Sequence, residues 1–140
     1  MSSHRQQLGS WAEQQACHLL QQQGYICIRQ QFHSRYGEID LIMADEQQLL
    51  FVEVKARGGR SLTPAHQTVT PSKQLKMAKT ALYFLQTHPE YSQHYARFDV
   101  VSFDFIDKFS KTALLNFSTY QYHMQWIENA FTFHEELINL

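Results

Sequence analysis

Two acidic residues and a lysine stand inside apolar stretches of this sequence, where charged side chains are costly. Asp40 lies between isoleucine and leucine, and Glu53 and Lys55 interrupt the apolar run of residues 49–56. An ionised side chain in a half-buried strand is unfavourable unless it is paired or holds a metal ion. These residues are therefore the first candidates for chemistry.

The polar segment between the two apolar runs predicts a β-hairpin that brings the two carboxylates together. If the turn is centred on Glu46 and Gln47, Asp40 lies opposite Glu53, with Cβ atoms roughly 4.5–5.5 Å apart. Two carboxylates so placed repel each other, and a hard divalent cation such as Mg²⁺, which takes carboxylate oxygens, explains them. Lys55 lies two residues along the same face and would offset charge on a substrate phosphate. A bulge or a shift of one residue would separate the pair, so the prediction depends on the register.

The same register makes two further predictions about the hairpin. Glu38 would lie opposite Lys55, and we expect it to be an ion-pair partner of this lysine rather than a metal ligand. Side chains alternate between the faces of a strand, so the second strand has one purely apolar face, which we expect to pack on the core. The members of this face are Leu50, Val52, Val54 and Ala56.

Length and composition predict one ordered globular domain over residues 1–140. The hydrophobic fraction is 44% and the aromatic fraction 14%, which is typical of a folded protein. An apolar run approaching membrane-spanning length and a secretory leader pattern are both absent from the sequence, so we expect a cytoplasmic protein. Cys17 and Cys27 lack metal-ligand spacing, and the eight histidines are scattered. We therefore expect both cysteines to be small buried residues, and we expect no zinc site.

The charge distribution says more than the net charge of −1. Residues 54–89 contain no acidic residue, and a continuous basic segment that begins beside the carboxylates is typical of a phosphate-binding face. A solvated helix face with a polar loop is the alternative. The lysines near the expected helix start at Thr70-Pro71 oppose the helix dipole, which favours an anionic ligand there. The six cations of this segment are Lys55, Arg57, Arg60, Lys73, Lys76 and Lys79.

Hydrophobic periodicity and turn residues predict an α/β fold, with a central sheet between helices in the order α-β-β-β-α-β. A C-terminal strand and a short helix follow. Gly24 is the expected end of the first helix, and Asp99 is expected to form local hydrogen bonds at a strand start. The expected segments are a helix at Leu8–Gln23, a strand from Tyr25 to Ile28 that reaches Phe32, a polar connection at Gln30–Tyr36, the hairpin at Gly37–Arg57, a loop at Gly58–Val69, a helix to about Thr87, strands at Arg97–Ile106 and Ala113–Tyr122, and a helix at Gln125–Phe131.

The ordered acids match a known pattern. An acid on the first helix, Asp on a strand and Glu-x-Lys on the next strand resemble the PD-(D/E)XK nucleases, through Glu13, Asp40 and Glu53-Val54-Lys55. Ile39 stands where the motif has its name-giving proline, and Ala12 where relatives often have glycine. Neither change removes a catalytic group.

The wider motif set resembles the YraN-like bacterial family, which is largely uncharacterised and is similar to Holliday junction resolvases. The resemblance extends from Leu8 to Phe131 and implies a restriction-endonuclease-like (also tRNA-endonuclease-like) core with a mixed sheet. The motifs are Gly9-Ser10-Trp11-Ala12-Glu13, Gly24-Tyr25, Gly37-Glu38-Ile39-Asp40-Leu41-Ile42, Phe51-Val52-Glu53-Val54-Lys55-Ala56-Arg57, Arg97-Phe98-Asp99-Val100-Val101 and Trp126-Ile127-Glu128-Asn129-Ala130-Phe131.

The resemblance implies a metal-dependent endonuclease that acts on DNA, with branched or damaged DNA as candidate substrates. Asp40 and Glu53, with a backbone carbonyl near Val54, would hold Mg²⁺ or Mn²⁺, which activates a water. Glu13 would bind the metal directly or through water. Lys55 would orient the water or neutralise the transition state. The residues implied to hold the DNA backbone, without sequence preference, are Arg57, Arg60, Lys73 and Lys76.

Three functions stay open at the level of sequence. The first is the nuclease, and the second is a nucleic-acid-binding module on the same fold that does not cleave. The third is a partner-binding protein whose carboxylates are structural. The oligomeric state is also open. Small nucleases of this kind often form homodimers to cut two strands, and the C-terminal strand and helix of this chain are the candidate interface.

Overall fold

The computed structural model describes residues 3–59, 64–106 and 116–133, except for the side chain of His4. Short 3₁₀ turns lie at Ala65–Thr68, Pro89–Tyr91 and Phe117–Thr119. The helices and strands are α1 (His4–Gln22), β1 (Ile26–Ser34), β2 (Gly37–Ala44), β3 (Gln48–Arg57), α2 (Pro71–Thr87), β4 (Tyr95–Phe105) and β5 (Tyr122–Phe131).

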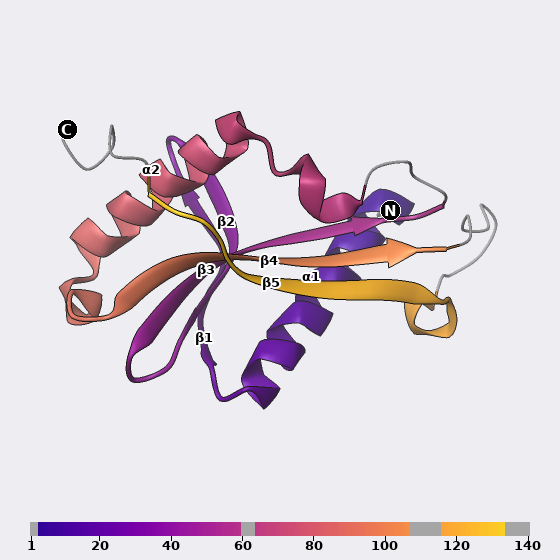
Figure 1. The fold of residues 1–140 in the computed structure, drawn as a ribbon, viewed down its shortest axis with the longest axis horizontal. Helices are drawn as coiled ribbons and strands as arrows, with labels where there is room; N and C mark the ends of the chain where they lie inside the picture. The colour runs from indigo at the N-terminus through magenta and orange to yellow at the C-terminus, as the bar shows by residue number, and fades with distance from the viewer. Residues whose placement is uncertain (1–2, 60–63, 107–115, 134–140) are drawn as a thin grey trace.

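The strands form one mixed sheet in the order β1-β2-β3-β4-β5. Only the β3–β4 pair is parallel among the described strands, and α2 makes the crossover between these two strands. Figure 1 shows α1 on one side of the sheet and α2 on the other. The predicted fold class is therefore confirmed, and the arrangement is consistent with a restriction-endonuclease-like core.

Both faces of the sheet carry a hydrophobic core. Leu50 and Val52 belong to the cluster beneath α1, as predicted for this face of β3. Phe51 belongs to a second cluster against α2 and is 0% exposed. The expectation of a single core face was therefore too narrow, because strands next to a parallel crossover are buried on both sides.

The two helices begin and end at local signals in the sequence. Ser3 and Gln6 form a reciprocal capping box at the start of α1, and Gly24 follows its end with a φ of 97°, as predicted for a helix stop. The side chain of Thr70 accepts a hydrogen bond from the backbone of Lys73 at the start of α2. The predicted start of this helix is thus confirmed.

Three predicted segments differ from the structure. Residues 30–34 continue β1 instead of forming a connection, because they pair with β2. The expected helix at Gln125–Phe131 is strand β5, which supplies hydrogen-bonding partners to the open edge of β4. The strand expected at Ala113–Tyr122 begins only at Tyr122, after a 3₁₀ turn, and residues 113–115 lie outside the described part of the chain.

The sheet opens between β2 and β3. Their paired residues run from Ala44 opposite Leu49 to Leu41 opposite Val52, although both strands extend further. Figure 1 shows the β1–β2 hairpin diverging there from β3, β4 and β5. We call this opening the fork.

Within the described ranges, no helix is long and apolar enough to cross a membrane.

Candidate functional site

The fork places the predicted carboxylates together. The pairing of Leu41 with Val52 confirms the predicted register, and its continuation would set Asp40 opposite Glu53. The ladder ends before that pair, however, and Asp40 Oδ2 instead accepts a hydrogen bond of 2.8 Å from the backbone N–H of Val54. The carboxylate of Asp40 therefore takes the place of a strand partner at the point where β3 loses its neighbour.

The backbone is irregular at this position. Ile39 and Ile42 both belong to the core against α2, whereas regular alternation would place them on opposite faces. In β1, Gln31 lies between residues that pair with Leu41 and Ile39, and it has a φ of 50°. Such departures in adjacent strands often re-aim a side chain near a functional site. Here they accompany the turn of Asp40 toward β3.

Glu53 is 2% exposed and is held by two lysines. Its Oε1 lies 2.7 Å from Nζ of Lys73 in the first turn of α2 and 3.6 Å from Nζ of Lys55 in β3. The sequence predicts an anionic ligand beside the lysines at the start of α2. The anion that contacts Lys73 is instead the carboxylate of Glu53. Although burial acts to lower it, the hydrogen bond and charge of Glu53 raise the pKa of Lys73. Burial lowers the pKa of Lys55, with the charge of Lys73 adding to this effect and that of Glu53 opposing it.

The carboxyl group of Asp40 is the most strongly perturbed in the fork. Burial and then the negative charge of Glu53 raise the pKa of Asp40 to about 8, against the opposing hydrogen bond from Val54. The second carboxylate therefore ionises only at a cost, because like charges in a partly buried site repel. A cation between the two would remove that cost.

Glu13 of α1 interacts electrostatically with Asp40 and Glu53. Its Oε2 accepts a hydrogen bond of 3.1 Å from the side-chain amide of Gln31. Burial raises the pKa of Glu13, as do the charges of Glu38 and Glu53, and hydrogen bonds with Gln31 and Asp40 oppose the rise. The helix acid therefore lies close enough to Asp40 and Glu53 for the three carboxyl groups to affect one another electrostatically.

The donor set suits a hard cation. Asp40 and Glu53 supply carboxylate oxygens, which Mg²⁺ and Mn²⁺ prefer, and their mutual repulsion favours any ion that binds both. Among the described residues, however, no three of the His, Cys, Asp and Glu side chains converge as a metal site. The arrangement thus fits a cation bound through two carboxylates and other oxygens, with Glu13 at longer range.

The residues predicted to hold DNA fall into separate groups. Lys73 is engaged by Glu53, whereas Lys76 is exposed on α2 and Arg57 is exposed at the end of β3. Arg60 lies outside the described residues. Of the described members of this set, Lys76 and Arg57 are therefore the ones exposed to solvent.

Two other acids have structural roles. Glu38 lies 3.3 Å from Nδ1 of His33, its neighbour across the β1–β2 pair, so the predicted pairing with Lys55 is wrong. Asp99 is 0% exposed and accepts hydrogen bonds from Trp126 Nε1 and from the backbone of Asn129, both at 2.9 Å. The expectation of a local hydrogen-bonding role for Asp99 is confirmed, and it extends to strand β5.

Three contributors to the site were missed from the sequence. The backbone N–H of Val54 leaves no trace in residue types, and Gln31 lies in a segment interpreted as a connection. The carboxylate contact of Lys73 had one signal, namely a cation at a helix start, but this was attributed to an external anion. Each contribution depends on how distant segments pack.

Comparison with known proteins identifies relatives in several bacteria. Residues 12–103 match the family described as Uncharacterised protein family UPF0102. A UPF0102 protein of Acinetobacter baumannii (strain AYE) is 53% identical over 127 residues, which cover 91% of this chain and 96% of the relative. Another from Acinetobacter baylyi is 51% identical, with 92% of each chain covered. A third, from Coxiella burnetii (strain RSA 493), is 44% identical over 72% of this chain and 84% of its own.

Proposed function

Since the chain belongs to the uncharacterised protein family UPF0102, whose description carries no activity, we propose a function from its fork. We propose that this protein is a Mg²⁺- or Mn²⁺-dependent endonuclease that acts on DNA. In this proposal it is related to the PD-(D/E)XK nucleases and Holliday junction resolvases. The observation that carries the proposal is the carboxylate of Asp40, hydrogen-bonded to the N–H of Val54, the residue after the buried Glu53. Burial and the charge of Glu53 raise the pKa of Asp40, and a bound divalent cation would relieve this repulsion.

The residues of the fork have distinct roles in this proposal. Asp40 and Glu53 would hold the cation, and a bound Mg²⁺ or Mn²⁺ would supply an activated water and Lewis-acid polarisation of the phosphodiester. The N–H of Val54 fixes the carboxylate of Asp40, so the ligand is oriented before the cation binds. Lys55 lies beside the pair, where its ammonium offsets the charge that develops on the phosphate oxygens. Its lowered pKa makes proton donation easier than for an exposed lysine.

Glu13 and Lys73 act on the carboxylates from the two sides of the sheet. Glu13, held by Gln31, adds negative charge near Asp40 and would help to hold the cation, directly or through water. Lys73 counterbalances Glu53 in the absence of the cation. Arg57, Arg60 and Lys76 supply positive charge for the DNA backbone, and a homodimer would place two such sites on opposite strands.

The test is cleavage of duplex, flap and junction DNA in Mg²⁺ or Mn²⁺, with D40N and E53Q beside the wild type. Mutation of a residue that only supports a metal ligand typically lowers metal affinity or activity about 10- to 100-fold. We therefore expect D40N and E53Q each to lower the cleavage rate more than about a hundredfold. D45N is the matched control, because the carboxylate of Asp45 lies in the β2–β3 turn and accepts hydrogen bonds from the backbone N–H groups of Gln47 and Gln48. Equal cleavage by D40N and wild type would overturn the catalytic assignment.

A specific observation also favours a non-catalytic nucleic-acid-binding module. The ammonium of Lys73 already lies 2.7 Å from Glu53, and a three-residue metal set is absent among the described residues. In that case the lysine is the permanent counter-ion of the site. Calorimetric titration with Mn²⁺ separates the two functions, since DNA binding without Mn²⁺ binding or cleavage would identify the module.

A further inference from the structure

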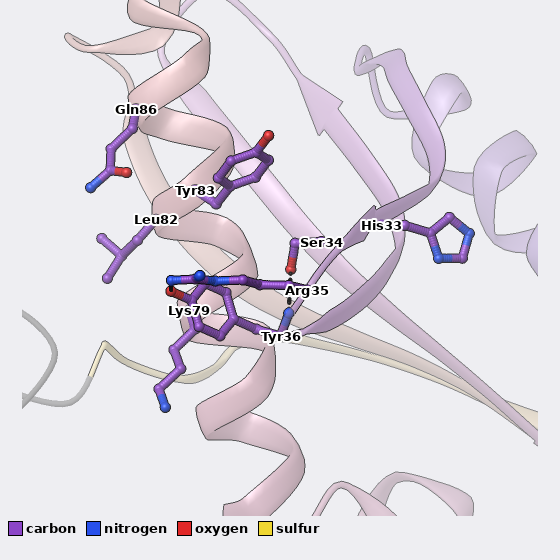
Figure 2. A pocket seen from close by; sticks show the side chains of 8 residues that line it. All are labelled: His33, Ser34, Arg35, Tyr36, Lys79, Leu82, Tyr83 and Gln86. Atoms are coloured by element: carbon purple, nitrogen blue, oxygen red, sulfur yellow. Dashed lines mark hydrogen bonds between the residues drawn. The ribbon is translucent and has the colours of Figure 1, made fainter.

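A second site is built between the β1–β2 turn and the middle of α2. It is a pocket of about 620 Å³, which is within the usual range for small-ligand pockets of about 300–1,000 Å³. The residues that matter for its chemistry are Arg35 and Tyr36 from the turn, and Lys79, Tyr83 and Gln86 from α2. Figure 2 shows Arg35, Tyr36 and Lys79 grouped together, while His33 points away from them.

The pocket gathers positive charge on an aromatic ring. The Arg35 guanidinium lies 4.8 Å from the centre of the Tyr36 ring, and Nζ of Lys79 lies 5.7 Å from the same centre. Arg35 also donates a hydrogen bond of 2.7 Å to the hydroxyl of Tyr36. None of the side chains that line the pocket is a carboxylate. The pocket is thus suited to an anionic ligand that also has a flat, apolar part.

The aromatic part of the pocket extends to α2. Tyr83 is 45% exposed and lies nearly parallel to Phe32, with 28° between the rings and 6.1 Å between their centres. Nucleic-acid bases stack on tyrosine rings and on arginine guanidinium planes, and the amide of Gln86 offers a donor and an acceptor for a base edge. A phosphate alone would leave these groups unused, whereas a nucleotide uses both the charge and the rings.

Helix α2 connects this pocket to the fork. Lys73 contacts Glu53 at the fork, and Thr80 hydrogen-bonds to Ser34 of the hairpin at 2.8 Å. Lys79 lines the pocket beside that contact. Lys79 lies six positions after Lys73, which corresponds to an axial rise of about 9 Å along α2. This length corresponds to two or three nucleotides at an axial rise of about 3.4 Å each.

We propose that the pocket binds an unpaired nucleotide of the DNA, two or three positions from the phosphodiester at the fork. This inference rests on the proposed function and adds a substrate class to it, namely duplex DNA next to unpaired nucleotides. A base within a duplex has its faces covered by its neighbours, so only an unpaired or flipped base can stack in the pocket.

The test measures binding in EDTA, where no cleavage occurs, by fluorescence anisotropy. The probes are a labelled duplex and the same duplex with a short single-stranded flap. We expect the wild type to bind the flapped DNA about tenfold more tightly, which is on the scale of one stacked base. We expect the double variant R35Q/K79Q to lose this preference while it keeps its affinity for the duplex to within about threefold. The matched control R5Q/R29Q removes two exposed cations elsewhere and should keep the preference.

A second readout separates stacking from general charge. A 2-aminopurine base in the flap is quenched when it stacks, so its fluorescence should fall with the wild type and stay high with R35Q/K79Q. An unchanged flap preference in R35Q/K79Q, or an equal loss of affinity for both DNAs, would overturn the proposal.

The outcomes also distinguish this pocket from the nuclease. Cleavage in Mn²⁺ with a flap preference that R35Q/K79Q does not alter would support the nuclease and reject the pocket. A flap preference in EDTA that needs Arg35 and Lys79, without any cleavage, would support the pocket and reject the nuclease. Failure of the wild type to bind either DNA would reject both.

Discussion

Asp40 and Glu53 carry negative charge into a part of the protein that solvent reaches poorly. Glu53 has its compensation in Lys73 and Lys55, whereas the hydrogen bond that Asp40 accepts comes from the backbone of Val54. The two acids are therefore unequal, and the pKa of Asp40 is the one that rises to about 8. At the scale of single residues, the fork is a site where protonation, metal binding and stability are linked.

The raised pKa of Asp40 predicts how stability depends on pH in EDTA. Because the folded-state pKa, about 8, lies above the ordinary value of 3.8, the folded protein binds this proton more tightly than the unfolded chain. The stabilisation is therefore fully present below pH 4 and is lost as the pH rises through about 8. We expect the melting temperature to fall over that interval in wild type and to fall less in D40N, whose amide keeps an acceptor for the Val54 N–H.

Thermal denaturation followed by circular dichroism across this pH range measures the effect. D45N is the control, since Asp45 is a half-buried turn residue whose pKa is lowered by hydrogen bonds from the backbone of Gln47 and Gln48, and this variant should follow the wild type above pH 5. Parallel curves for D40N and wild type between pH 5 and 9 would contradict the assignment of the raised pKa to Asp40.

Lys73 gives a second prediction at the residue scale. K73Q removes the ammonium that lies 2.7 Å from the buried Glu53. A hydrogen bond to a charged group is worth about 1.5–3 kcal/mol, so we expect a loss of about 1–3 kcal/mol in the free energy of unfolding at pH 7. Urea denaturation measures it, with K76Q as the control, because an exposed surface change usually alters stability by less than about 0.5 kcal/mol. Equal stability of K73Q and K76Q would show that Lys73 does not stabilise Glu53.

Two elements position the fork and the pocket, and both are fixed by contacts between distant segments. Strand β5 is held to β4 by Asp99, which joins Arg97, Trp126 and the backbone of Asn129. The β1–β2 turn is held to α2 by Ser34, whose hydroxyl also accepts a hydrogen bond from the N–H of Tyr36. Loss of either set of contacts would displace β5 or the β1–β2 turn without altering the side chains of Asp40 and Glu53.

For β5, we expect D99A to be strongly destabilising. The variant leaves Arg97 buried without its carboxylate, with 10% of its side chain exposed, and it leaves the indole N–H of Trp126 unpaired. Removal of one partner from a buried ion pair costs about 3–5 kcal/mol. Urea denaturation should show this loss, while E128Q, at the exposed end of the same network, should cost less than about 1 kcal/mol. A loss below 1 kcal/mol in D99A would contradict the role given to Asp99.

For the turn, the backbone conformation of Gly37 favours glycine, while its surroundings leave room for a methyl group. It has a φ of 154°, and an added Cβ would lie 3.5 Å from Cβ of Lys76. We expect G37A to destabilise the protein by about 1–3 kcal/mol, because a side chain strains this conformation. G9A is the control, since Gly9 lies within α1 with open space around its Cβ position and should gain about 0.5–1 kcal/mol. Thermal melting of both variants tests the pair, and a neutral G37A would contradict the strain assigned to this backbone conformation.

For the whole molecule, the arrangement of charge matters more than its sum. The net charge is −1, yet the segment from Lys55 to Lys79 carries cations without acids. DNA binding should therefore be confined to one face and should weaken steeply with salt.

K76Q tests this arrangement through the salt dependence of DNA affinity. If Lys76 neutralises one phosphate, the slope of log K against log salt should decrease in magnitude by about 0.9 relative to wild type. Fluorescence anisotropy at several salt concentrations measures the slope. R5Q removes a cation of the first helix outside this segment and should leave the slope unchanged. If the two variants behave alike, the basic segment is not the binding face.

The sequence by itself determined the parts of this protein that depend on neighbours along the chain. Thr70-Pro71 and Gly24 marked helix ends, and the turn at Glu46-Gln47 fixed the hairpin register that brings Asp40 and Glu53 to the fork. Local backbone preferences and alternation of side chains are sufficient for these features.

Only the tertiary structure decided the features that join distant segments. It turned residues 125–131 into β5 against an open sheet edge, placed Lys73 on Glu53, and set the β1–β2 turn against α2 to form the pocket. These three features have the same physical reason. A buried carboxylate, an unpaired strand edge and a charged turn each need a partner, and residues nearby in the sequence do not supply it. Tertiary packing determines which distant residues become these partners, and it thereby determines the chemistry that the fork and the pocket can perform.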